Sequence, residues 1–160
     1  MIKMNLVIIP CYKQLIETIL KCFNLLLKYA KEKNIILKIN EKNNDNNYPL
    51  LIATENKNNE IIKSLLHYAE KYNIPLEMME KNRNGDYPFL CAINGNNFNI
   101  VDRLIHHAEK FNIFLDMNEQ NDNGNYPFLS AIQNNNNEII KLVLNYSEKH
   151  SIPLEINRKK

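Results

Sequence analysis

Histidine and cysteine are among the side chains of this chain that could bind a metal ion or act as a nucleophile. His67 and His106 lie 39 residues apart, and His107 follows the second of them. Two zinc ligands must each reach within about 2 Å of one ion, whereas packed helix axes lie about 8–10 Å apart. Adjacent side chains also diverge by about 100° around a helix. We therefore expect these histidines to face solvent, and we expect no metal site.

The cysteines give no better support for catalysis. Cys91 lies in a short apolar segment, at a position that Ile52 and Ser130 occupy at the same 39-residue spacing, which favours a small packing residue over a nucleophile. Cys11 and Cys22 have no histidine or aspartate at a spacing typical of a nucleophile and its base. The sequence contains no phosphate-binding glycine loop, no His-Glu-x-x-His and no Gly-x-Ser-x-Gly motif. The chain is therefore predicted to be non-enzymatic and to need no cofactor.

A motif that occurs three times must position whatever surface the chain uses. Each copy opens with an Asn/Asp/Gly-rich turn followed by Tyr-Pro, and Tyr48, Tyr87 and Tyr126 are 39 residues apart. Gly85 and Gly124 supply a turn position that tolerates positive φ, and the first copy has asparagine, the next best residue, in that slot. A fixed period of this size predicts a stacked array of repeats rather than a single globule.

Two helices are predicted in each copy. Proline fits the first turn of a short apolar helix, which spans Pro49 to about Asn56 in the first copy. An Asn-rich turn separates it from a longer helix that begins at Glu60, Asn99 or Glu138. Apolar residues of the longer helix recur at i, i+1, i+4, i+5 and i+8, which is a helical stripe. In the first copy this stripe consists of Ile61, Ile62, Leu65, Leu66 and Ala69.

These motifs resemble the ankyrin repeat. Residues 85–92, Gly-Asp-Tyr-Pro-Phe-Leu-Cys-Ala, are similar to the family's turn glycine, Thr-Pro-Leu-His and following alanine, and residues 100–105 are similar to its Ile-Val-x-x-Leu-Leu helix. Tyrosine replaces the threonine, and leucine replaces the histidine that ties neighbouring turns in the family. The repeat also exceeds the usual ~33 residues, with the extra length expected as helix and loop over residues 70–73. The resemblance implies an all-α, ankyrin-like α-solenoid of stacked helix-turn-helix repeats with Asn/Gly-rich turns.

We expect four units along the chain: a degenerate N-terminal capping repeat at 1–39, then ankyrin-like repeats at 40–78, 79–117 and 118–160. The last long helix carries the same apolar stripe as the internal ones, so no dedicated C-terminal cap is expected. That face is predicted to be covered by a continuation of the array beyond the chain end; a partner or a second copy is the alternative.

Composition restricts the partner and the compartment. A net charge of +2 without a basic block does not favour nucleic acid. The apolar run at residues 6–9 is too short for a membrane span or a signal peptide. Three cysteines without framework spacing favour a reducing compartment, so a cytoplasmic location is expected. We expect no membrane and no small-molecule substrate as partners.

The remaining candidate is a protein-binding surface. In ankyrin-like proteins the concave face consists of the turn tips and the exposed side of the short helices, and here those positions differ between copies while the framework does not. The resemblance therefore implies a protein–protein interaction module that binds an unidentified partner protein through this face. The alternative is a structural spacer or scaffold segment of a longer array with no ligand of its own. The expected partner-binding residues are Asn44, Asp45, Asn47, Glu55, Arg83, Asn84, Asp86, Asn94, Asp122, Asn123, Asn125 and Gln133.

Overall fold

The computed structural model describes residues 21–155. The apolar run at residues 6–9, Cys11, the first half of the expected N-terminal cap and the last five residues lie outside the described residues. Contacts divide the chain into two compact units, Met1–Lys38 and Ile39–Lys160. In the first unit, residues 21–32 form a helix. This helix is followed by Asn34 in the left-handed region, with a φ of 52°.

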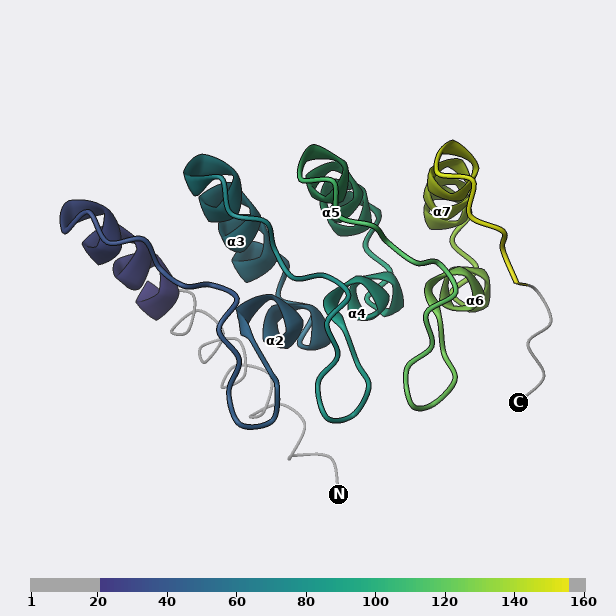
Figure 1. Cartoon of the computed structure of the whole chain (residues 1–160), viewed down its shortest axis with the longest axis horizontal. Helices are drawn as coiled ribbons and strands as arrows, with labels where there is room; N and C mark the ends of the chain where they lie inside the picture. The colour runs from purple at the N-terminus through teal and green to yellow at the C-terminus, as the bar shows by residue number, and fades with distance from the viewer. Residues whose placement is uncertain (1–20, 156–160) are drawn as a thin grey trace, which may run out of the picture. The chain divides into compact units, whose positions relative to one another are not determined.

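The second unit contains three pairs of helices, each a short helix followed by a long one. The pairs are α2 (Pro49–Glu55) with α3 (Asn59–Tyr72), α4 (Pro88–Asn94) with α5 (Phe98–Lys110), and α6 (Pro127–Gln133) with α7 (Asn137–Lys149). The short helices pack side by side in one layer and the long helices in a second layer (Figure 1). No strand occurs among residues 21–155. The all-α stacked fold is as predicted, and each long helix begins one residue earlier than expected.

Proline and asparagine define where the helices begin. Each short helix has proline at its first position after an extended tyrosine, as at Tyr87, whose φ is −143° and ψ is 153°. Each long helix begins after an asparagine whose side chain accepts a backbone N–H bond, as Asn97 does from the N–H of Ile100. Asn58 and Asn136 cap α3 and α7 in the same way. A cap of this kind stabilises a helix by about 1 kcal/mol.

Asparagine also supplies most of the left-handed backbone positions. After the short helices, Asn96 and Asn135 have φ values of 54° and 51°. After the long helices, Asn73 and Asn112 both have a φ of 54°. Asparagine tolerates this region better than most residues with a side chain, because its amide bonds locally to the backbone. As predicted, the additional residues of this long repeat extend α3 to Tyr72 and form the left-handed turn after it.

The core lies between the two layers and between consecutive pairs. Tyr87, Phe89 and Leu90 are fully buried in the central pair. Equivalent positions of the long helices are buried in every copy: Leu65, Leu104 and Val143 are each 0 % exposed. Fully burying one such side chain contributes about 1.5–3 kcal/mol relative to leaving it in water. Because each pair covers the apolar stripe of its neighbour, the tips of the turns are held on a rigid base.

Candidate protein interface

Each unit begins with a turn whose backbone is fastened by one asparagine side chain. The Asn82 Oδ1 atom accepts hydrogen bonds from the N–H groups of Asn84 at 2.9 Å and Asp86 at 3.0 Å. Asn43 and Asn121 accept the equivalent two bonds in their own turns. We call Asn43, Asn82 and Asn121 the clamp asparagines. Because the side chain satisfies two backbone donors, it holds the turn in one conformation.

The amide nitrogen of a clamp asparagine also connects one turn to the unit before it. Asn82 Nδ2 donates to Asn47 Oδ1 at 3.0 Å and to Glu55 Oε1 at 3.1 Å. Asn121 Nδ2 donates to Asp86 Oδ1 at 2.9 Å. The sequence predicts these asparagines only as turn residues, and the link between units emerges from the structure. Their recurrence at a 39-residue spacing is the signal that could have revealed it.

The tyrosine of each Tyr-Pro pair makes a second link between units. The Tyr48 hydroxyl donates to the Glu80 carbonyl at 2.9 Å, and the Tyr87 hydroxyl donates to the Glu119 carbonyl at 2.5 Å. Burial raises the pKa of both phenols, so they remain protonated donors at neutral pH. The sequence departs from the ankyrin signature at this tyrosine and lacks the histidine that ties turns in that family. The tyrosine and the clamp asparagine tie the turns here instead.

Replacing Tyr87 by phenylalanine should lower the free energy of unfolding by about 1 kcal/mol. The ring would still fill its buried site, but the Glu119 carbonyl would lose its donor. Chemical denaturation followed by circular dichroism measures the change. Tyr72→Phe, in a half-buried ring at the end of α3, is the matched control. Equal stability of the Tyr87 variant and the native chain would show that the hydroxyl is not a link between units.

Most of the expected partner-binding residues are accessible at the turn tips and at the ends of the short helices. Asn47, Asp86 and Asn125 are half-buried instead, and the first two accept bonds from the clamp asparagine of the next unit. The structure also pairs Arg83 with Asp45, Nη1 to Oδ1, at 3.2 Å. The exposed members of the set are Asn44, Asp45, Glu55, Arg83, Asn84, Asn94, Asp122, Asn123 and Gln133. We call these exposed residues, together with Asp86, the tip face.

Close approach of two turns explains the glycine of the second turn. Gly85 has a φ of +74°, a conformation that residues with a side chain rarely adopt. A Cβ atom there would lie 2.6 Å from the Asp122 backbone nitrogen. The second and third turns are therefore in direct contact, and Asp122 projects over Gly85.

Carboxylates give the tip face its electrostatic character. It carries Asp45, Glu55, Asp86 and Asp122 but only one cation, Arg83, which is already paired with Asp45. Burial raises the pKa of Glu55, and the nearby Asp86 raises it further, while the bond from the clamp asparagine lowers it. The face is thus acidic on a chain whose net charge is +2.

Cys91 lies beside these carboxylates on α4 and is a free thiol. Burial raises its pKa to about 12, and Asp86 and Glu55 act in the same direction. The thiol is therefore protonated at neutral pH and is a poor nucleophile. This agrees with the interpretation of Cys91 as a packing residue.

The prediction for the histidines is right for two of them and wrong for the third. His67 and His106 are exposed, as expected. His107 is buried, and its Nε2 atom accepts the Leu76 N–H at 3.3 Å. Its counterparts at the 39-residue spacing are Tyr68 and Tyr146, which are also buried. His107 therefore lies at a packing position that recurs in each unit of this chain. Its side chain faces the preceding unit and not the solvent side of α5.

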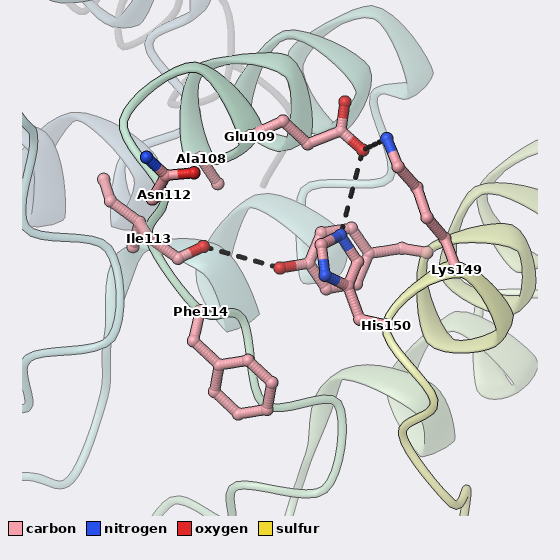
Figure 2. Close-up of a pocket in the computed structure, with 8 residues that line it drawn as sticks. Ala108, Glu109, Asn112, Ile113, Phe114, Lys149 and His150 are labelled. Carbon is pink, nitrogen blue, oxygen red and sulfur yellow. Dashed lines mark hydrogen bonds and ion pairs between the residues drawn. The ribbon is translucent and has the colours of Figure 1, made fainter.

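A groove of about 410 Å³ lies at the C-terminal ends of α5 and α7, away from the turn tips. Figure 2 shows Lys149 and His150 reaching across it towards Glu109, with Phe114 on its rim. Glu109 Oε1 lies 2.6 Å from Lys149 Nζ and 4.0 Å from His150 Nε2. The bond from Lys149 lowers the pKa of Glu109. This arrangement holds two units together and contains no pair that could act as nucleophile and base.

Residues 21–155 offer neither a metal-binding cluster nor a membrane-spanning helix. No group of three or more His, Cys, Asp or Glu side chains in that range is placed to hold a metal ion. No helix there has the length and apolar character needed to cross a membrane.

The fold and the repeated turns define a class of protein, the helical-repeat solenoids that stack short helix pairs behind projecting turns. A family model described as ankyrin repeats (3 copies) matches residues 71–153, just over half of the chain. The chain belongs to the ankyrin repeat family. A search of curated proteins found no match. Ankyrin repeats are in general protein–protein interaction modules, and the family is typically non-enzymatic.

Proposed function

We propose that the chain binds a basic segment of a partner protein through the tip face. The observation that carries this proposal is the proximity of two carboxylates: Glu55 accepts a bond from Asn82, Asp86 accepts one from Asn121, and the charge of Asp86 raises the pKa of Glu55. The pKa of Glu55 is raised in part by Asp86, so a lysine or arginine side chain placed there would relieve an existing repulsion. Asp122 extends the acidic character to the third turn.

Rigidity of the tip face supports the same proposal. The clamp asparagines and the buried tyrosines fix the turns to one another before any partner arrives. A partner therefore loses little free energy in ordering this surface, which is the advantage of a preorganised site. The polar side chains of the tips differ from unit to unit, whereas the residues that hold them do not. Such a surface allows specificity to be set by side chains without altering the fold.

The expected energies are modest for each contact. An exposed ion pair contributes about 0–1 kcal/mol, and the tip face offers one arginine and no tryptophan as an anchor. Binding should therefore depend on several carboxylates acting together, and it should weaken as salt screens them. Association should also be fast at low ionic strength, since the acidic face attracts a basic segment over a distance.

Paired charge variants test the proposal. Glu55→Gln with Asp86→Asn removes both central charges while leaving side-chain oxygens to accept the bonds from Asn82 and Asn121. The native chain and this variant would be used to capture proteins from a lysate of the source organism, and the affinity of each captured protein would be measured at two salt concentrations. We expect affinity to fall roughly tenfold in the variant.

The control removes the same charge elsewhere. Glu60→Gln with Glu138→Gln changes exposed carboxylates in the first turns of α3 and α7. This control should retain the native affinity. If the tip variant and the control capture the same proteins with equal affinity, the tip face has no role, and the spacer or scaffold alternative would be favoured.

A further inference from the structure

Two apolar side chains of the last helix pair are exposed, although their apolar counterparts in the preceding pairs are buried. Leu144 of α7 is 42 % exposed, whereas Leu66 and Ile105, which hold its position in the preceding pairs, are 0 % and 6 % exposed. Ile132 of α6 is 44 % exposed, whereas its counterpart Ile93 is 0 % exposed. In the earlier pairs these side chains are covered by the pair that follows. The last pair therefore presents one half of an interface that the chain itself forms twice.

The helix over residues 21–32 presents the opposite half. Leu26 is 49 % exposed and Tyr29 is 54 % exposed. The long helices have Leu65, Leu104 and Val143 at the position of Leu26, and each of these side chains is 0 % exposed. At the position of Tyr29 they have Tyr68, His107 and Tyr146, all below 5 %. These helices end alike, because Ile35 donates to Ala30 at 2.8 Å as Ile74, Ile113 and Ile152 donate within their own units.

The contact between α5 and α7 shows what this position does when it is covered. The Tyr146 hydroxyl accepts the Leu115 N–H at 3.1 Å and donates to the Ile113 carbonyl at 3.4 Å. A dashed line in Figure 2 marks the second of these bonds. In the contact between α3 and α5, His107 at the same position accepts the Leu76 N–H. The aromatic residue at this position thus meets the extended segment that follows the preceding long helix.

We propose that the chain associates head to tail with a second copy of itself. Leu26 and Tyr29 of one copy would pack on Leu144 and Ile132 of the other copy. The Tyr29 hydroxyl would then meet the segment at residues 152–154, as Tyr146 meets residues 113–115. A second copy is the favoured occupant because the two exposed surfaces are complementary halves of an interface already present between consecutive pairs. This association uses neither the tip face nor its carboxylates.

Charges at the edge of this interface give it a defined register. Glu148 holds the position of Glu109, which pairs with Lys149 and faces His150 in the internal contact. At the end of the helix over residues 21–32, Glu32 holds the position of Lys149 and Lys33 holds the position of His150. Lys33 would therefore face Glu148 favourably, and Glu32 would face it unfavourably. Glu32→Lys should strengthen the association several-fold.

The test exploits the fact that a head-to-tail interface has two different halves. Sedimentation velocity of the full chain should show assemblies whose mean mass rises with concentration. Tyr29→Glu and Leu144→Glu should each weaken self-association at least ~10-fold, since each buries a charge at the interface. A mixture of the two variants should form a dimer, because the intact half of one variant meets the intact half of the other, and growth should stop there.

Three results would overturn the proposal. They are a native chain that stays monomeric at all concentrations, single variants that associate like the native chain, and a mixture that fails to dimerise. The last result would indicate a symmetric dimer, and the first would leave these surfaces to a different protein or to further repeats. Ile52→Glu is the matched control, because Ile52 has the same 44 % exposure as Ile132 but lies on α2. Circular dichroism would establish that each variant is folded.

Discussion

Replacing Asn82 by alanine should destabilise the chain by about 3 kcal/mol. Its buried side chain makes four hydrogen bonds, accepting from Asn84 and Asp86 and donating to Asn47 and Glu55. Each bond contributes about 0.5–1.5 kcal/mol, and the groups left without a partner add a desolvation cost. The free energy of unfolding from urea titration measures the loss.

Two further variants separate the roles of this side chain. Asn84→Ala removes an exposed amide from the same turn and should change stability by less than about 0.5 kcal/mol. Asn82→Asp keeps the acceptor for the turn but loses the donor, and it adds a carboxylate beside Glu55. It should therefore destabilise the chain nearly as much as alanine does. A neutral aspartate variant would mean that the link between units has little energetic weight.

His107→Tyr should make the chain more stable, and the gain should grow as the pH falls. Burial lowers the pKa of His107 to about 4, with Glu70 acting against the shift and Lys110 adding to it. In the unfolded chain the imidazole titrates near 6.5. Between pH 6.5 and 4 the unfolded chain binds a proton that the folded chain does not, so the native protein loses stability across that window. Tyrosine does not titrate there and removes this loss.

The size of the effect follows from the shift and from the bonds at this position. A shift of this size corresponds to at most about 3 kcal/mol below pH 4. At neutral pH the gain should be about 1 kcal/mol. The reason is that His107 Nδ1 is buried with no hydrogen-bond partner among the described residues, whereas tyrosine at this position can both accept and donate, as Tyr146 does. Unfolding curves at pH 7, 5 and 4 measure both quantities.

The exposed His67 provides the control for this pH dependence. His67→Gln should keep the native slope of stability against pH, because its side chain lies on the solvent side of α3. If His107→Tyr retained the native slope, the buried imidazole would not be the group responsible. The acid sensitivity would then have to come from carboxylates such as Glu109, whose pKa is lowered in the folded chain.

The fold could be predicted from the sequence because the same residues recur at a constant spacing. Tyr-Pro, the apolar stripe of the long helix and the turn glycines specify local structure, and their period specifies stacking. The excess of asparagine predicts turn chemistry, but it does not predict the separate roles of the individual asparagines. Asn82 fastens a turn and links two units, Asn97 caps a helix, and Asn112 supplies a left-handed residue. These roles depend on where each amide points, which a period alone does not give.

The candidate site was less accessible to sequence reasoning. Glu55 and Asp86 are separated along the chain, and only the stacking of α2 against α4 brings the two carboxylates close enough for Asp86 to raise the pKa of Glu55. The acidic character of the tip face is therefore a property of the fold and does not appear in a net charge of +2. The prediction that His107 faces solvent like His106 is wrong, and its alignment with Tyr68 and Tyr146 is the signal that indicates a buried position.

The most direct test of the proposed binding is an amide-resolved NMR titration of the full chain with the basic segment of a captured partner. The proposal predicts that shifts concentrate at the turn tips, over residues 44–47, 83–86 and 122–125, and at the exposed ends of α2, α4 and α6. The same peptide with its lysines and arginines replaced by glutamine should produce no shifts. Shifts confined to α3, α5 and α7, or equal shifts with both peptides, would contradict recognition of a basic segment by the tip face.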